Sequence, residues 1–256
     1  MKKKNIYFQR IQQKILNFLF PPVCKGCGID IEDNEGLCAQ CFIQFQMIVE
    51  PYCERCSVPF SHISFGGAQK ICVSCQTKPP LWRSARAAFV YNDWSRKIIF
   101  LFKYYGHTEY ADFIGQRMIQ AGNNILKKAD LLVPVPMYVG KLRKRKFNQA
   151  ALLAHYVSRK TSIPVIPDGL QRIRETRALA SLSGEQRAEE IKNVIKVREK
   201  RRNHFKGKSI ILVDDVLTTG VTASVCVKEL LEAGALSVDI LVAARTNSEN
   251  NLYNNE

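Results

Sequence analysis

The sequence predicts an α/β domain, a parallel sheet with flanking helices, preceded by a small cysteine-rich module. Two observations carry this prediction. Short apolar, β-favouring runs alternate with segments of helical periodicity from residue 82 onward, and eight of the nine cysteines lie between residues 24 and 75. We therefore divide the chain into an amphipathic helix (1–20), a cysteine-rich module (21–78), an α/β domain (82–246) and a polar tail (247–256) that we expect to be disordered.

The N-terminal segment has helical spacing of apolar residues, with Ile11, Ile15 and Phe18 on one face. Together with the basic Lys2–Lys4 this stripe fits a membrane surface, or it packs on the rest of the protein. The longest apolar run there, Phe18–Val23, is too short to span a bilayer, and no secretory signal precedes it. We expect no transmembrane segment and a cytoplasmic protein, either free or peripheral to the inner membrane.

The cysteines of the first module form four CxxC knuckles. In a reducing compartment such pairs are metal ligands more often than disulfides, and two knuckles complete a tetrahedral Cys₄ shell for structural Zn²⁺. Sequential pairing, with the first four cysteines on one zinc ion and the next four on another, closes the shortest loops, and we expect it for that reason. Interleaved pairing and iron–sulfur ligation are the alternatives. The predicted zinc ligands of the two sites are Cys24, Cys27, Cys38 and Cys41, then Cys53, Cys56, Cys72 and Cys75.

Composition narrows the classes of partner. A hydrophobic content of 46% is typical of globular proteins, and 38 Lys and Arg residues against 23 Asp and Glu residues give a formal net charge of +15. This excess favours phosphates, nucleic acid or an anionic membrane, and charge alone does not choose among them.

The elements of the α/β domain follow a linker at Thr77–Leu81 with two prolines. The long polar and basic segment Gln171–Lys208 has no clear apolar period and is typical of an active-site lid or a partner-binding surface. The expected strands are Ala85–Tyr91, Asp130–Val135, Ile163–Ile166, Ser209–Val213 and Ser237–Ala244, and the expected helices are Trp94–Tyr104, Glu109–Leu126, Phe147–Ser158 and Ala223–Ala233.

The stretch Ser209–Thr222, SIILVDDVLTTGVT, combines a buried strand, two carboxylates and a turn that opens a helix. Asp214 and Asp215 stand at the carboxyl end of a parallel strand, where open α/β sheets bind ligands, and suit sugar hydroxyls or a Mg²⁺ shell. The following residues offer hydroxyl and backbone N–H groups to a phosphate at a helix N-terminus: Thr218, Thr219, Gly220, Val221 and Thr222. An ordinary βα unit with a capped helix is the alternative.

A second predicted anion site follows the strand that ends at Val135, because Pro136 and Met137 stop that strand in a fixed turn. Directly after it, five of six positions are basic. Such a run of basic residues usually forms a solvated helix face. Here the run directly follows a loop at the ligand-binding end of a strand, which favours contact with phosphate or nucleic acid. The basic residues are Lys141, Arg143, Lys144, Arg145 and Lys146, and Arg143 is also a candidate ligand of the second anion.

The thirteen residues from Ile210 to Thr222 resemble, at every position, the motif with which type I phosphoribosyltransferases bind phosphoribosyl pyrophosphate (PRPP). The wider set of motifs resembles the ComF family of bacterial competence-associated proteins, over about Leu19 to Arg245. These motifs are LFPPVCKGC, the four knuckles, FKYYGH (102–107), VPVPM (133–137), KLRKRKFNQ (141–149) and VDDVLTTGVT (213–222). The sequence departs from the family at Lys146, where glycine is common, and at Leu179, where glutamine is usual in a pattern that includes Arg174 and Thr176.

The resemblance implies a protein of natural transformation, or of the use of external DNA, that binds PRPP with Mg²⁺. Asp214 and Asp215 would be the catalytic carboxylates, the Thr218–Thr222 loop would take the 5′-phosphate, and Val135–Met137 the pyrophosphate. Two hypotheses remain: a binding protein for PRPP and single-stranded DNA, with a helicase-like partner, or an active phosphoribosyltransferase with an unidentified acceptor. A structural adaptor, the third alternative, would leave the Asp pair without a role.

Overall fold

The structure, a computed structural model, describes residues 21–31, 36–104, 108, 110–175 and 193–247. The predicted N-terminal helix, residues 248–256 of the predicted tail, Thr176 and Leu179 lie outside these ranges. The chain divides into two units, Met1–Gln46 and Met47–Glu256, and each is described by itself.

The first unit holds the first two knuckles. The Cys24 knuckle closes with a hydrogen bond from the backbone N–H of Cys24 to the Ile29 carbonyl, at 2.7 Å. Helix α2 (Ala39–Gln44) follows Cys38, whose side chain accepts a hydrogen bond from the N–H of Cys41 as the N-cap. The helix thereby places the two thiols of its knuckle one turn apart.

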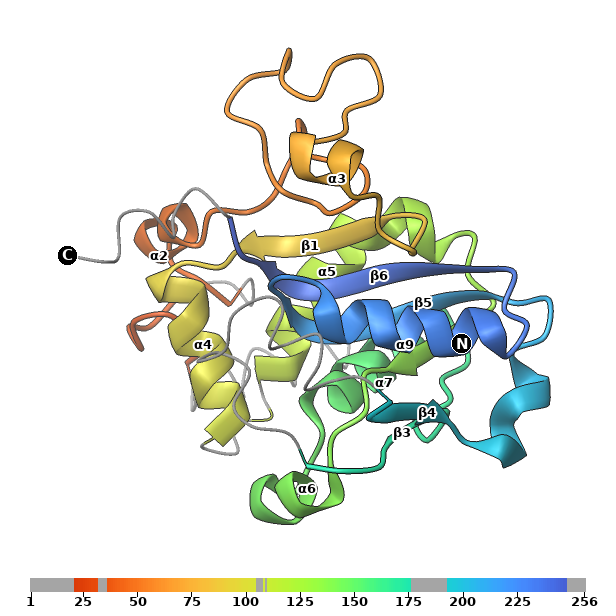
Figure 1. Cartoon of the computed structure of the whole chain (residues 1–256). Coiled ribbons are helices and arrows are strands. Elements are labelled where there is room, and N and C mark those ends of the chain that lie inside the picture. Colours follow the sequence, from red (N-terminus) through yellow and green to blue (C-terminus); the bar gives the residue numbers. More distant parts are fainter. Residues whose placement is uncertain (1–20, 32–35, 105–107, 109, 176–192, 248–256) are drawn as a thin grey trace, which may run out of the picture. The chain divides into compact units, whose positions relative to one another are not determined.

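The second unit is built on a parallel sheet in the order β1-β6-β5-β2 (Figure 1). Its strands are β1 (Ala85–Val90), β2 (Leu131–Pro134), β5 (Ser209–Leu217) and β6 (Ser237–Arg245). Runs of Val, Ile, Leu and Ala make the two central strands buried on both faces, as helices on both faces of a sheet require. An isolated parallel bridge between Leu132 and Val165 continues the sheet beyond β2, where a fifth strand is predicted.

Helices cover both faces of this sheet. Helix α9 (Val221–Glu232) lies on one face, and α5 (Tyr110–Leu126) and α7 (Gln149–Thr161) lie behind it on the other (Figure 1). The two rear helices pack closely at Gly115, where a Cβ atom would come within 2.3 Å of the Tyr156 ring. Helices α4 (Asp93–Tyr104) and α6 (Val139–Arg145) follow β1 and β2. This architecture confirms the predicted fold class, and among the described residues no helix has the length and hydropathy to cross a membrane.

The second pair of knuckles, with helix α3 (Val73–Thr77), lies beyond the β1 edge of the sheet (Figure 1). The backbone N–H of Ala87 in β1 donates to the Ser57 hydroxyl at 3.0 Å, and the N–H of Ile48 donates to the Ala88 carbonyl at 2.9 Å. Arg86, which is buried, forms an ion pair with Glu54. This second ribbon, residues 47–81, is therefore bonded directly to the edge strand.

A short antiparallel hairpin, β3 (Leu170–Arg172) and β4 (Ile195–Val197), rises from the segment predicted as a lid or a partner surface. Glu229 of α9 anchors it, because its carboxylate accepts from Lys196 at 2.9 Å and from the backbone N–H of Val197 at 3.2 Å. The 3₁₀ helix η2 (Glu199–His204) leads from the hairpin to β5. Residues 176–192, between the two strands, lie outside the described ranges.

Candidate functional site

The two candidate carboxylates lie inside strand β5 and not in a loop after it. We predicted a strand end at Val213, but pairing with β6 continues through Asp214 opposite Val242 and Val216 opposite Ala244. Backbone ladder bonds do not depend on side-chain polarity, which is why the apolar run ends before the strand does. Asp214 and Asp215 therefore have side chains on opposite faces of the sheet's carboxyl end.

Asp214 is held in an environment that opposes its charge. Burial and the neighbouring Asp215 carboxylate raise the pKa of Asp214 to about 7, against a partial stabilisation by Lys103 and Arg172. Its Oδ1 accepts one hydrogen bond, from the backbone N–H of Asp215 at 2.9 Å. The Asp214 carboxyl therefore exchanges a proton near neutral pH, and a ligand that donates hydrogen bonds to it favours the ionised form.

Asp215 is paired with Lys103 of α4 at 2.7 Å, and both side chains are largely buried. Burial alone would lower the pKa of Lys103, but the Asp215 carboxylate outweighs it and raises that pKa. From the sequence we place Lys103 only in the expected helix Trp94–Tyr104 and do not join it to the Asp pair. The FKYYGH motif was the available signal, since it puts a basic residue at the end of an apolar helix.

The Thr218–Thr222 loop turns sharply into α9. Thr218 and Thr219 are exposed, and Gly220 is the N-cap of the helix with φ 80°, a left-handed conformation that favours glycine. A Cβ atom at Gly220 would also come within 2.7 Å of the Trp82 ring. Free N–H groups at the start of this twelve-residue helix offer hydrogen bonds and a positive dipole end to a phosphate.

The end of β2 lies beside the Asp pair. The backbone N–H of Val135 donates to the Val213 carbonyl at 2.9 Å, so the turn at Val135–Met137 begins next to Asp214. Asn148 fixes this turn: its Nδ2 donates to the Val135 carbonyl at 3.0 Å, while its Oδ1 caps α7 by accepting from Ala150 at 3.0 Å. The structure thus brings together the Asp pair and both predicted anion loops.

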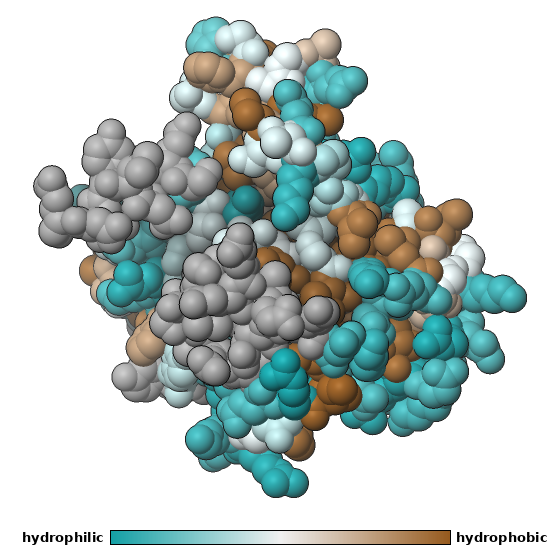
Figure 2. All heavy atoms as spheres, viewed as in Figure 1, coloured by the Kyte–Doolittle hydropathy of each residue, from teal (hydrophilic) through white to brown (hydrophobic). Residues whose placement is uncertain are grey.

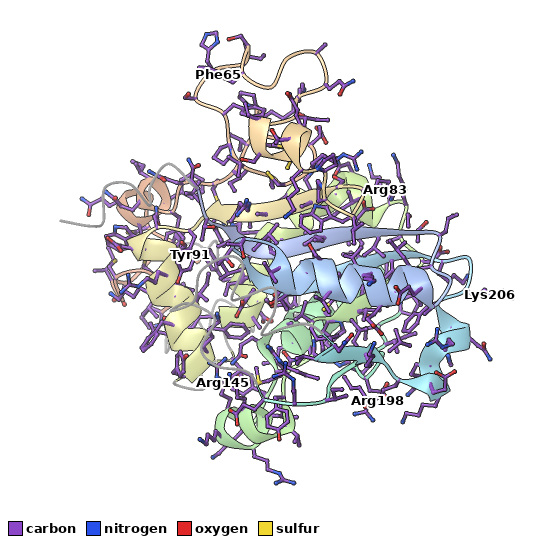
Figure 3. The ribbon with its side chains drawn as sticks, viewed as in Figure 1. Phe65, Arg83, Tyr91, Arg145, Arg198 and Lys206 are labelled. Atoms are coloured by element: carbon purple, nitrogen blue, oxygen red, sulfur yellow. The ribbon has the colours of Figure 1, made fainter. Side chains whose placement is uncertain are left out.

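The basic run forms helix α6 and its C-cap. Arg143, Lys144 and Lys146 are exposed, and Lys141 is partly buried. Arg145, labelled in Figure 3, lies over the Tyr104 ring at 4.6 Å and donates to its hydroxyl at 2.8 Å. An aromatic ring thus lies beside the basic residues. Lys146 has φ 66°, a left-handed conformation that glycine adopts without strain.

The cysteines gather as the sequential pairing predicts. In each of the two groups the four sulfur atoms lie within 4.8 Å of one another. The Sγ atoms of Cys27 and Cys38 are 3.8 Å apart, and those of Cys56 and Cys72 are 3.7 Å apart. A ZnS₄ tetrahedron with bonds of about 2.3 Å has edges of about 3.8 Å, so both groups fit Zn²⁺.

Backbone N–H groups point at the sulfur atoms of both groups. Although burial opposes the charge, the N–H groups of Cys38 and Gly26 lower the pKa of Cys24 to about 6, and they lie 3.2 and 3.4 Å from its sulfur. A hydrogen bond from Cys56, with the backbone N–H of Cys72, lowers the pKa of Cys53 to about 4. Thiolates stabilised in this way are ready metal ligands.

Arg245, at the end of β6, connects the second ribbon to the phosphate loop. Its Nε donates to the Cys56 carbonyl at 3.0 Å, and its Nη1 donates to the Leu217 carbonyl at 3.0 Å and to the Thr218 carbonyl. From the sequence we predict only a strand that ends at Ala244, just before this residue. The guanidinium therefore holds a cysteine knuckle and the start of the candidate phosphate loop in one fixed arrangement.

Comparison with known proteins supports the order of domains described above, with the cysteine-rich ribbons first and the α/β domain after them. A model of the double zinc ribbon domain matches residues 15–81, and one of the phosphoribosyl transferase domain matches residues 153–252. Competence protein F of Haemophilus influenzae is 27% identical over 87% of this chain and 95% of its own. The DNA utilization protein YhgH of Salmonella typhimurium is 25% identical over 88% and 98%, and competence protein ComFC of Bacillus subtilis is 26% identical over 84% and 87%.

Proposed function

We propose that this chain is a member of the ComF family, and that it acts in competence or in the use of external DNA by binding PRPP with Mg²⁺ and contacting single-stranded DNA. One observation carries the proposal. Two carboxylates, the N-terminus of α9 with its free N–H groups and the turn at Val135–Met137 converge at the carboxyl edge of the sheet, where open α/β sheets bind ligands.

The ligand we propose has three anionic or polar parts that match these three groups. The ribose hydroxyls donate to Asp214 and Asp215, and the 5′-phosphate accepts hydrogen bonds from the Thr218–Thr222 loop. The pyrophosphate lies at Val135–Met137, with Arg143 on the helix that follows. The carboxylate oxygens are the kind of ligand Mg²⁺ prefers, and the ion would neutralise charge on the pyrophosphate.

Calorimetry with PRPP and Mg²⁺ tests this assignment. Because a hydrogen bond to a charged group contributes about 1.5–3 kcal/mol, we expect Asp214→Asn and Asp215→Asn each to weaken binding about 10- to 100-fold. Asp130→Asn is the matched control, because Asp130 accepts from the N–H of Ser209 at the opposite end of the same strands. Absence of PRPP heat in the parent protein refutes the site, whereas pyrophosphate release during the titration extends the proposal to phosphoribosyl transfer.

For single-stranded DNA we propose the α6 surface, because exposed cations stand there beside the Tyr104 ring, which packs at 4.8 Å on Phe100. Cations bind the phosphate backbone and aromatic rings stack with bases. Replacing Arg143, Lys144 and Lys146 by Gln removes three charges, which should reduce the slope of log K against log salt by about 2.

The control removes three charges elsewhere, at Lys127, Lys128 and Lys206, which are exposed and near the other end of the sheet. Fluorescence anisotropy of a labelled oligonucleotide measures both slopes. Equal slopes for the two triple variants would exclude α6 as the principal DNA contact.

A further inference from the structure

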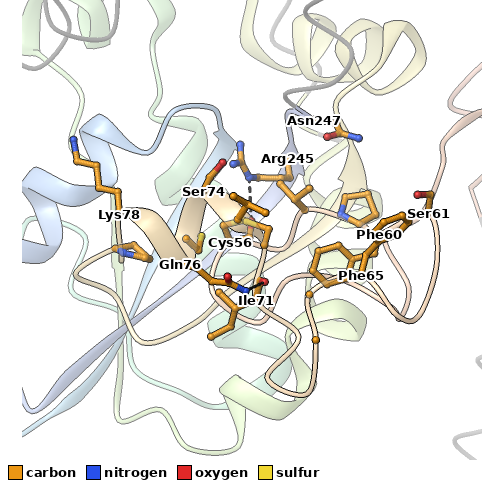
Figure 4. Close-up of a pocket in the computed structure, with 18 of the residues that line it drawn as sticks. Cys56, Phe60, Ser61, Phe65, Ile71, Ser74, Gln76, Lys78, Arg245 and Asn247 are labelled. Carbon is orange, nitrogen blue, oxygen red and sulfur yellow. Dashed lines mark hydrogen bonds between the residues drawn. The ribbon is translucent and has the colours of Figure 1, made fainter.

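A pocket of about 580 Å³ lies between the second ribbon and the candidate phosphate loop (Figure 4). Most of its wall comes from the ribbon, where Phe60 and Phe65 face the cavity with Ile71. The α/β domain contributes Trp82, Thr219 and Arg245 to the lining. Its volume is in the range of sites that hold a nucleotide-sized ligand.

The lining combines aromatic rings with a few polar groups. Phe65 stands at the ribbon's outer loop and is 55% exposed (Figure 3), and hydrophobic residues show on this lobe at the top of Figure 2. Gln76 and Ser74 of α3 add an amide and a hydroxyl beside these rings. Flat apolar faces with hydrogen-bonding groups at their edge are what a nucleobase requires, since every base has a π-face and a polar rim.

Arg245 gives the pocket a preorganised cation. Three of its hydrogen bonds, to the carbonyls of Cys56, Leu217 and Thr218, use Nε and Nη1. Its Nη2 has no hydrogen-bond partner among the described residues, so two N–H donors remain for a ligand. Because the fork is already fixed, little side-chain entropy is lost when an anion or a carbonyl binds there.

Thr219 belongs both to the pocket wall and to the phosphate loop, whereas Asp214 and Asp215 are not among the pocket's lining residues. The candidate phosphate loop therefore borders both the candidate sugar site at the Asp pair and this pocket, which is a second candidate site. PRPP carries a 5′-phosphate monoester, which has nothing to place in the second site. In a DNA strand the same phosphate is a diester, and the preceding nucleoside is attached to it.

We propose that this pocket holds a base of a single DNA strand whose following phosphate lies in the Thr218–Thr222 loop. The inference rests on the proposed function, because it takes that loop as the phosphate site. The proposed pocket is a second DNA contact, distinct from α6. The proposal also predicts that PRPP and single-stranded DNA compete for the protein. PRPP and the strand need the same phosphate position, so one displaces the other.

Trp82 allows a direct test, since it lines the pocket and the chain has two tryptophans. In full-length, zinc-loaded protein with Trp94→Phe, a (dT)₁₀ oligonucleotide should quench the remaining Trp82 emission. Phe65→Ala should raise the dissociation constant about 5- to 10-fold, near the lower end of measured base-stacking effects because the ring is half exposed. Ile63→Ala is the control, because Ile63 is 71% exposed in the same loop and lies outside the pocket wall.

The outcomes separate three claims: the base pocket, the shared phosphate position and PRPP binding itself. Anisotropy that reports binding with no change in Trp82 emission, or equal effects of Phe65→Ala and Ile63→Ala, overturns the pocket. Quenching that saturating PRPP does not reverse, in protein shown to bind PRPP, overturns the shared phosphate position. Quenching in protein that gives no PRPP heat refutes PRPP binding and leaves the nucleobase site standing.

Discussion

Replacing Asp214 by Asn should stabilise the protein at pH 8 while it weakens binding of PRPP. The Asp214 carboxyl has its pKa raised from 3.8 to about 7 by burial and by Asp215. The unfolded chain releases this proton near pH 4 and the folded chain keeps it until about pH 7. Folding stability therefore falls as the pH rises between these values, and the full cost applies above pH 7.

The expected gain in the free energy of unfolding follows from the pKa shift of Asp214. About three pKa units at 1.36 kcal/mol each give an upper bound of about 4 kcal/mol. Asp214 is only partly buried, so we halve this figure for solvent screening and expect about 2 kcal/mol. For a domain of this size that corresponds to a rise of about 4–8 °C in the melting temperature.

Thermal unfolding at two pH values measures this change. The gain from Asp214→Asn should be complete at pH 8 and fall to about half at pH 5.5, because less of the ionisation cost applies there. Asp215→Asn is the comparison, and it should lower the melting temperature, because it removes the partner of the largely buried Lys103 at 2.7 Å. A melting temperature for Asp214→Asn that is unchanged or lower at pH 8 would refute the reasoning.

Three further predictions concern particular backbone and metal positions. Gly220→Ala should destabilise the protein by about 1–3 kcal/mol, because φ is 80° and the new Cβ would meet Trp82; a denaturant titration with an unchanged midpoint contradicts this. Lys146→Gly should stabilise it by about 1 kcal/mol by relieving a left-handed lysine, which the same titration measures. Cys41→Ser and Cys56→Ser should each reduce bound zinc from two ions to one by elemental analysis, and loss of both ions from either variant would show that the clusters are not independent.

Much of the fold follows from local patterns in the sequence. The apolar runs place β6 and α4 within a residue or two of their ends, because burial on both faces or on one stripe is visible in the order of residues. The sequential grouping of the cysteines was predictable for a related reason, since neighbouring knuckles close short loops. The carboxyl end of β5 was not, because pairing with β6 extends the strand through two aspartates.

The contacts that complete the candidate site join residues far apart in the chain. Lys103 of helix α4 reaches Asp215 of strand β5, and Arg245 reaches Cys56 across 189 positions. In the sequence, Lys103 and Arg245 look like ordinary charged residues at the ends of apolar segments. Which partner each of them meets depends on strand order, and strand order is set by packing of the whole sheet. The motifs indicate the chemistry proposed for the site, whereas the fold determines which residues surround the Asp pair.

The bond between Arg245 and Cys56 also constrains the order of folding. The second ribbon has all its cysteines once Cys75 is made, but β1, to which it is attached, pairs in the sheet with β6. At about 5–20 residues per second, the 189 positions between the bonded residues take roughly 10–40 s to synthesise. We expect the ribbon to bind its metal ion once Cys75 is made, while the sheet is still unfinished. Thiol labelling of ribosome-bound chains that end before Ser237 should find the second cluster protected, and full reactivity there would instead show that the ribbon needs the sheet to form.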